Sequence, residues 1–357
     1  MLKGVPVLSR RPERIPHFLT SAPVYSNSDS MDYFSLTAAC RETGDRFTGR
    51  KIRGAAQVSA EEVILSFGRE GEILLSAAPA RPGLFLLPEK ISREPFPSPF
   101  NEIFSSRIRG AALVSLSMPD AGERIVFLHF QPGWPGRAGE EIILALEVMG
   151  RRSNMALVEK GRILAPLRPV PAEKSPRRPF LPGLTWKLPP PRPGKPPEQI
   201  MVQDLPELHG RSRPELIEAL AREIKGLSPF TANQILLRAS DGEATSILQI
   251  LREALDAADG SRGWLYASGG KTWLCPFQPL IPEGERGEVQ PFQPFSAASW
   301  AWLQTDTVPE AGGNERDGQL LADLEQEESR LEKTLSFLVT EEERCATHDE
   351  LRTKGQA

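Results

Sequence analysis

The first half of the chain alternates short apolar runs with breaks rich in glycine and proline. Segments 36–46 and 100–109 have helical patterns. Apolar runs of strand length cover residues 62–67, 72–76, 83–87, 111–118, 124–130, 142–149, 155–158 and 163–164. Many short strands beside few helices predict an α+β fold rather than alternating β/α units.

The second half begins with a helical pattern. Ser212 can cap one helix, Gly226 can end it, and Ser228-Pro229 can start a second, which predicts a helix-hairpin-helix type of module. A third helix is expected over 245–258. Beyond it we expect strands at 264–266, 272–275 and 276–280, a loop over 282–293 and a helix over 295–303.

Two segments differ from the rest in composition. Residues 174–197 hold nine prolines, which predicts an extended linker lying on the first domain through Phe180 and Trp186. In the tail, Leu324, Leu331 and Leu338 recur every seven residues, which predicts a long coiled-coil helix. The expected division is 1–30 extension, 31–173 β-rich domain, 174–197 linker, 198–260 helical module, 261–313 small strand and loop region, and 314–357 coiled-coil arm.

The charge is distributed unevenly along the chain. The net charge is −4, but segment 151–197 holds eleven Lys or Arg against two Glu, and segment 315–354 holds twelve acidic against six basic residues. The basic segment favours a polyanionic partner. No apolar run is long enough for a transmembrane helix, which predicts no membrane association.

Residues with recognisable chemistry are few. The three cysteines lie far apart and the four histidines show no metal-ligand spacing, so neither a disulfide framework, a metal site nor a cofactor is predicted. We find no phosphate-binding GxxxxGK[ST] loop and no G-x-S-x-G elbow. The sequence therefore predicts no catalytic residues and no enzyme.

Between the apolar runs 142–149 and 155–158 lies Gly150-Arg151-Arg152-Ser153-Asn154. Glycine permits a tight backbone, serine and asparagine can bond to it, and two guanidinium groups can contact phosphates. The residues alone leave two interpretations open: a corner with solvated arginines, or a phosphate-binding turn.

Two motifs in this region resemble those of a known family. Glu147-x-Met149-Gly150-Arg151-x-Ser153-Asn154 is similar to the E-x-M-G-R-H-S-N motif of the NFACT (fibronectin-binding protein A) N-terminal family, with Arg152 in place of histidine. The segment from Arg178 to Pro190 resembles that family's R-x-x-x-P-G-x-x-Y-x-x-P-P, with Trp186 in place of tyrosine. Ser30-Met31-Asp32-Tyr33 resembles the start of the family.

The resemblance implies an N-terminal domain like that of MutM-type DNA glycosylases. It also implies a role in ribosome-associated quality control in the cytoplasm. There the protein would bind tRNA, in bacteria alanyl-tRNA, on a large ribosomal subunit that still carries peptidyl-tRNA, and so support mRNA-independent alanine tailing. The family's returning coiled-coil arm and C-terminal RNA-binding domain are not in this sequence, and a separate chain is one source for that arm.

The resemblance also implies a tRNA-binding site. The family's acidic residue near the start corresponds to Asp32, and its Asp-Arg pair at a strand head corresponds to Glu123 and Arg124. From the residues alone, Asp32 is also a helix N-cap, and Glu123 and Arg124 are equally compatible with a solvated turn pair. Further RNA phosphate contacts are expected at Arg151, Arg152, Arg177 and Arg178.

Two alternatives stay open. One is a surface adhesin that binds fibronectin, as the family's older name suggests. The other is a MutM-like DNA-binding protein without glycosylase activity, because the chain has neither the N-terminal Pro-Glu pair nor the cysteine quartet of those enzymes.

Overall fold

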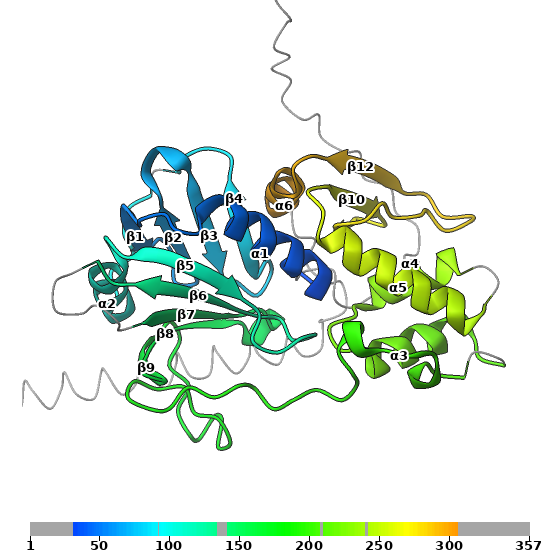
Figure 1. Cartoon of the computed structure of the whole chain (residues 1–357), viewed down its shortest axis with the longest axis horizontal. Coiled ribbons are helices and arrows are strands. Elements are labelled where there is room, and N and C mark those ends of the chain that lie inside the picture. Colours follow the sequence, from blue (N-terminus) through cyan, green and yellow to red (C-terminus); the bar gives the residue numbers. More distant parts are fainter. Residues whose placement is uncertain (1–30, 92, 134–140, 208–209, 240–241, 306–357) are drawn as a thin grey trace, which may run out of the picture. The chain divides into compact units, whose positions relative to one another are not determined.

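The computed structural model describes residues 31–91, 93–133, 141–207, 210–239 and 242–305. They lie within a compact unit that ends at Thr307. The predictions for residues 1–30 and for the coiled-coil segment 314–357 fall outside the described residues. The fold is α+β, as the sequence predicted, with three antiparallel sheets and helices against them (Figure 1).

Two of the sheets are antiparallel meanders in which each strand pairs with the next along the chain. The four-stranded sheet contains β1 (Gly54–Gln57), β2 (Glu62–Ser66), β3 (Glu72–Ser76) and β4 (Gly83–Leu87). The five-stranded sheet contains β5 (Ala112–Ser117), β6 (Ile125–Gln131), β7 (Ile142–Glu147), β8 (Asn154–Glu159) and β9 (Arg162–Pro166). The strands predicted at 62–67 and 72–76 are confirmed as β2 and β3, which pair as a hairpin with Leu65 opposite Ile73.

Helix α1 (Tyr33–Phe47) is the central element of the described chain. It contacts β4, β5, α5 and α6, so both large sheets and the C-terminal helices meet on it (Figure 1). The Asp32 side chain caps it by accepting from the Ser35 N–H at 2.9 Å. The predicted second helix is α2 (Pro99–Ile108), which packs on β1 and β9.

The helical module follows the proline-rich linker and two short 3-10 turns, η3 (Pro197–Gln199) and η4 (Val202–Asp204). It consists of α3 (Arg213–Glu223), α4 (Pro229–Arg238) and α5 (Ala244–Ala258). Ser228 caps α4 as predicted, accepting from the Thr231 N–H at 3.1 Å. Gly226, with φ +74°, provides the left-handed turn between α3 and α4.

The third sheet has the order β11-β10-β12, with β10 (Gly263–Ser268), β11 (Lys271–Cys275) and β12 (Glu288–Phe292), and α6 (Phe295–Gln304) follows it. Two predictions were wrong here. Residues 276–280 form no strand, and β12 occupies part of the predicted loop 282–293. The sequence also missed β1, because its Gly-Ala-Ala-Gln lacks the β-branched and aromatic residues typical of strands.

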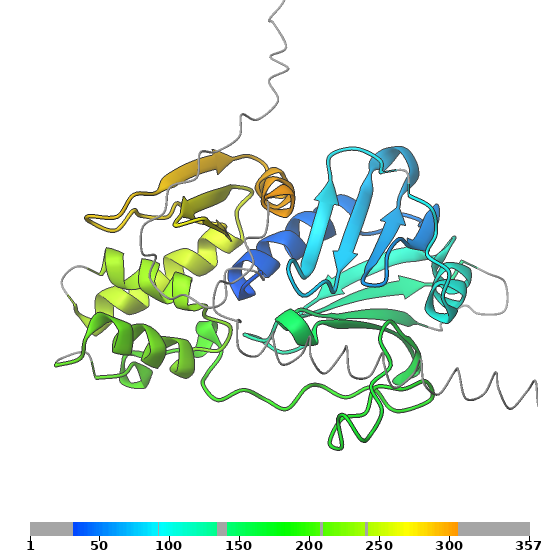
Figure 2. The same ribbon diagram turned by 180° about the vertical axis from the view of Figure 1, so that it is seen from behind.

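The apolar residues form one main core and two smaller clusters. The main core joins both large sheets to α1 and also includes Leu265, Leu274 and Trp302 from the C-terminal segment. Figure 2 shows α6 beside β4, where Trp302 stacks on Phe85 with ring centroids 6.3 Å apart. Trp302 and Trp273 are both buried, so neither ring is available to stack on a nucleic-acid base.

The other two clusters cover the helical module and the outer face of the five-stranded sheet. Phe180 of the proline-rich segment is buried in the latter cluster and Trp186 packs against it, which confirms that the linker lies on the first domain. The domain boundaries themselves stay a prediction. Among the described residues, no helix combines the length and apolarity needed to cross a bilayer.

Candidate functional site

The start of α1, the head of β6 and the loop between α3 and α4 meet at one junction. Asp32 Oδ2 accepts from the Thr231 hydroxyl at 2.6 Å and from the Ser228 hydroxyl at 3.1 Å. The carboxylate is nearly buried, with 9% exposed, and these bonds compensate for its lost hydration. Asp32 therefore joins the N-terminal helix to the helical module almost 200 residues later.

Arg124, at the head of β6, donates from Nη1 to the carbonyl oxygen of Met31 at 3.2 Å. Burial and the neighbouring positive charge of Arg192 lower the pKa of Arg124 to about 10, while Asp32 and Glu123 act in the opposite direction. A pKa of about 10 still leaves the guanidinium charged at neutral pH.

Glu123 is 5% exposed, so the interpretation of Glu123 and Arg124 as a solvated turn pair is wrong for Glu123. Its Oε1 accepts from the backbone N–H of Arg192 at 3.3 Å, and its Oε2 lies 3.9 Å from Arg192 Nε. The Arg192 side chain is half-exposed, at 50%. Arg192 is thus the solvent-facing cation of the group. Sequence reasoning counted it only as part of the basic linker.

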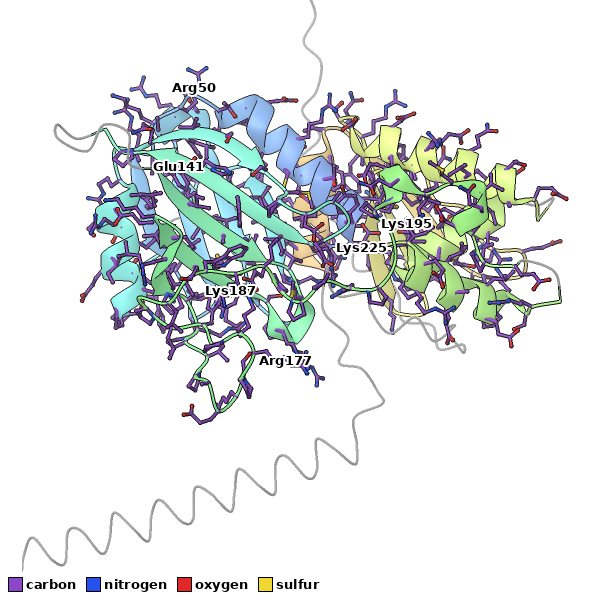
Figure 3. The ribbon with its side chains drawn as sticks, turned by 60° about the horizontal axis from the view of Figure 1, so that its bottom comes forward. Arg50, Glu141, Arg177, Lys187, Lys195 and Lys225 are labelled. Carbon is purple, nitrogen blue, oxygen red and sulfur yellow. The ribbon has the colours of Figure 1, made fainter. Side chains whose placement is uncertain are left out.

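Close backbone approaches hold this junction together. A Cβ on Gly226 would lie 2.5 Å from the Gly122 carbonyl oxygen and 2.6 Å from Tyr33 Cβ, so only glycine fits there. Two further backbone bonds, each of 2.9 Å, join Lys195 to Glu223 and Lys225 to Lys195. Figure 3 shows Lys195 and Lys225 near each other where these segments meet. The linker, the helical module and the β6 head are therefore fixed in one geometry.

The two long motifs meet at a second place. Arg178 donates to both carboxylate oxygens of Glu147, at 2.9 and 2.5 Å. Its guanidinium also lies over the rings of Phe180 and Trp186, 5.2 and 5.5 Å from their centroids. This contact fastens the proline-rich segment to the end of β7.

The turn at Gly150–Asn154 is built by its polar side chains. Gly150 has φ +58°, and the Ser153 hydroxyl accepts from the Met149 N–H at 2.8 Å. Asn154 exchanges two hydrogen bonds with the backbone of Arg168, at 2.8 and 3.0 Å. Gly150, Ser153 and Asn154 are thus structural, and they present Arg151 and Arg152 to solvent.

The profile described as "NFACT N-terminal and middle domains" matches residues 32–357. The chain belongs to the NFACT family. Among solved structures, this NFACT chain is similar to the N-terminal part of the fibronectin/fibrinogen-binding protein from Streptococcus suis, with 19% identity, a TM-score of 0.63, and 77% of this chain and 99% of that one covered.

Two further solved structures are similar. The fibrinogen-binding protein from Staphylococcus aureus is 16% identical with a TM-score of 0.61, over 75% of this chain and 97% of that one. The N-terminal domain of the fibronectin-binding protein PavA from Streptococcus pneumoniae is 21% identical with a TM-score of 0.51, over 78% and 99%. No curated protein matches the sequence. At these identities the likeness establishes the fold.

Within this NFACT chain, the structure brings together Asp32, Glu123 and Arg124, and it adds Arg192. The arginines that were expected to contact RNA phosphates differ in their exposure to solvent. Arg151, Arg152 and Arg177 are exposed, whereas Arg178 is held in the ion pair with Glu147. Among the described residues, no cluster of His, Cys, Asp or Glu is arranged to hold a metal ion.

Sequence reasoning also missed a hydrogen-bond chain across the five-stranded sheet. His129 Nε2 lies 2.8 Å from the Ser117 hydroxyl, and its Nδ1 lies 2.8 Å from Glu141 Oε1. The order serine, histidine, carboxylate is that of a nucleophile and its base. Here, however, the serine lies in a paired strand opposite Phe127 rather than on a turn that exposes it. We infer that these two hydrogen bonds hold β5, β6 and the start of β7 together.

Proposed function

We propose that this protein binds tRNA and the obstructed large ribosomal subunit in the cytoplasm, and that it supports mRNA-independent alanine tailing of stalled nascent chains. The protein would position RNA while the ribosome transfers the peptide, so it would not act as an enzyme. This proposal follows from membership of the NFACT family, together with the site residues that the family's motifs assign.

One observation carries the proposal. The three residues assigned to tRNA by resemblance come from segments about 90 residues apart, and they lie at one junction with a half-exposed arginine beside them. Such convergence is expected of a site that binds one ligand.

The residues divide into two roles under this proposal. Arg192 is exposed and would meet an RNA phosphate directly. Arg124 would present its planar guanidinium to the same phosphate, beside the carboxylates of Asp32 and Glu123, which favour its charged form. A planar guanidinium can donate two parallel bonds to a phosphate, whereas lysine acts as a point charge.

The test is alanyl-tRNA affinity measured on Arg192→Ala, Arg124→Lys and Arg124→Ala in the full chain. Loss of one charge-assisted contact should weaken binding about 5- to 150-fold. Arg124→Lys should bind nearly as weakly as Arg124→Ala. The matched control is Arg252→Ala, which removes an exposed arginine from α5.

Thermal midpoints must be measured on the same preparations, because Arg124→Ala also removes the bond to Met31. Arg192→Ala and Arg124→Lys make the decisive comparison, since the first changes an exposed side chain and the second keeps the charge. Affinities equal to that of Arg252→Ala would refute the assigned site.

A second candidate is binding of fibronectin or fibrinogen, because the similar solved structures carry those names. Binding to immobilised fibronectin that survives Arg192→Ala, without measurable tRNA binding by the original protein, would favour it. DNA is the alternative polyanion if the N-terminal domain resembles MutM-type proteins as the family implies. Competition of duplex DNA against tRNA distinguishes these two nucleic acids.

A further inference from the structure

A second basic feature lies outside the linker and the junction. The chain leaving α1 and the connection between β2 and β3 enclose a concavity of about 360 Å³, lined by Lys51, Arg53, Phe67, Gly68, Arg69 and Glu70. Figure 3 labels Arg50 beside this region and Arg177 on the opposite side of the large sheets in that view. We call these lining residues the β2–β3 pocket.

The pocket has an excess of positive charge. The side chains of Lys51, Arg53 and Arg69 are exposed, and in the described part of the chain none of them forms an ion pair or a side-chain hydrogen bond. The one lining carboxylate, Glu70, is already paired with Arg50 at 3.3 Å. Three cations therefore face one concavity without a counter-charge of their own.

The backbone around these cations is well fixed. Phe47 and Phe67 stack beneath the turn with centroids 4.0 Å apart. The Arg53 N–H donates to the Ser66 carbonyl at 2.7 Å, and the backbone of Lys51 pairs with that of Ala112 in an isolated antiparallel β-bridge. The backbone that carries the cations is thus held by hydrogen bonds and ring stacking, so binding an anion requires ordering of the side chains and not of the backbone.

The glycines of the turn make room for the arginines. A Cβ on Gly68 would lie 3.2 Å from Arg53 Cγ, so the Arg53 side chain runs directly over that glycine. A Cβ on Gly71 would lie 3.2 Å from Arg46 Nη2, and Arg46 donates to the Glu70 carbonyl at 2.8 Å. The side chains of Arg46 and Arg53 therefore both pack against this turn.

We propose that the β2–β3 pocket binds a phosphate group. Several lysine and arginine donors that line one concavity match a doubly charged tetrahedral oxyanion better than a single carboxylate. Two sources share this chemistry: a backbone phosphate of bound RNA and a free phosphate or pyrophosphate. The RNA source rests on the proposed function, whereas the free source does not.

The first arm of the experiment uses pyrophosphate as the probe, with binding to the full chain followed by phosphorus NMR line broadening at low ionic strength. In the double variant Lys51→Ala/Arg69→Ala, affinity should fall at least about tenfold. The matched control is Arg252→Ala/Arg262→Ala, which removes two exposed cations elsewhere. All four side chains are exposed, so both variants should keep the thermal midpoint. If pocket and control variants bind pyrophosphate equally, the proposal is overturned.

The second arm measures tRNA affinity against salt for the same proteins. A drop in affinity with a smaller salt slope, by roughly 1 per lost phosphate contact, supports RNA as the source. Unchanged tRNA binding together with lost pyrophosphate binding supports the pocket and assigns it to a free phosphate ligand. If the original protein binds no tRNA, the proposed function fails, while the pyrophosphate arm still decides the pocket.

Discussion

The ion pair between Glu147 and Arg178 shows how single residues fasten a segment without regular structure. The Glu147 side chain is 3% exposed and that of Arg178 is 17% exposed, so water screens the pair poorly. Backbone hydrogen bonds also join the linker to β9 and the turn before it, between Leu184 and Ile163 at 2.8 Å and between Trp186 and Gly161 at 2.9 Å. We infer that the ion pair, together with these backbone bonds and the packing of Phe180 and Trp186, decides where the proline-rich segment lies.

The pair leads to a prediction on stability. Arg178→Ala should lower the free energy of unfolding by about 3–5 kcal/mol, because it leaves the Glu147 carboxylate buried and unpaired. Arg178→Lys should cost about 1–3 kcal/mol, since lysine keeps the charge but loses the bidentate bonds and the stacking on two rings. Denaturant unfolding of both variants measures this.

The neighbouring arginine provides the control. Arg177 is exposed, and its replacement by alanine should change stability by no more than about 0.5 kcal/mol. If Arg178→Ala behaved like Arg177→Ala, the pair would be unimportant for the fold, and Arg178 would again be available as an RNA contact.

A buried thiol leads to a prediction on pH. Burial raises the pKa of Cys40 to about 12, whereas an unfolded cysteine ionises near about 8.5. The folded thiol keeps its proton while the unfolded one loses it, so this contribution to stability is complete below the unfolded pKa. It is lost as the pH rises toward about 12.

We therefore expect the free energy of unfolding to fall more steeply above pH 9 in the original protein than in Cys40→Ala. The difference in slope should approach about 1.4 kcal/mol per pH unit. A cavity left by the substitution shifts the curve of Cys40→Ala vertically and leaves its slope unchanged. Parallel curves from pH 8 to 10.5 would contradict the assignment.

At the scale of elements, the junction depends on two turns that touch through glycine. Gly226 lies within the α3–α4 loop, and Gly122 lies just before the β6 head. Their contact brings the helical module to the same place as Asp32 and Arg124. The geometry of the junction therefore depends on these two turns as well as on the charged residues.

Gly226→Ala and Gly183→Ala should separate backbone preference from packing. Both glycines have positive φ, +74° and +81°, which costs alanine about 1–2 kcal/mol. A Cβ at position 183 would meet nothing within 4 Å, whereas at position 226 it would overlap Gly122 and Tyr33. Gly226→Ala should therefore cost a further 1–3 kcal/mol or so. Equal denaturant midpoints, with equal m-values, would mean that the turns separate at little cost.

Elements with strong local patterns could be predicted, and elements that depend on distant partners could not. Helices with caps, such as α4 after Ser228, and the hairpin β2–β3 follow from neighbouring residues. Strand β12 contains Pro291 and is formed by pairing with β10, which no local pattern indicates.

The same limit applies to the candidate site. Resemblance selected Asp32, Glu123 and Arg124, but the sequence could not show that Asp32 bonds to Thr231 or that Arg192 covers Glu123. These contacts join residues up to 199 positions apart, and they depend on how the helical module packs against α1. A site whose residues all lie within one motif can be predicted from the sequence, whereas a site assembled from several elements cannot.

For the whole molecule, the question is whether the proline-rich linker separates independent domains. The packing favours a single unit. The main core includes residues from Met31 to Trp302, and Tyr33 of α1 belongs to the cluster of the helical module. The hydroxyl of Tyr33 also donates to Glu198 at 2.6 Å, beyond the linker. Neither part can expose its core without opening the contacts of α1.

We therefore predict that residues 31–305, produced alone, unfold in one cooperative transition. Calorimetric and van 't Hoff enthalpies should agree, and near- and far-ultraviolet circular dichroism should give the same midpoint. Deleting residues 1–30 from the full chain should leave the thermal midpoint unchanged, because the described core begins at Met31. Two transitions would show that the boundary at 174–197 divides domains energetically. In that case Gly226→Ala should increase the difference between the two midpoints, because it weakens the contact of Gly226 with Gly122 and Tyr33 that couples the two parts.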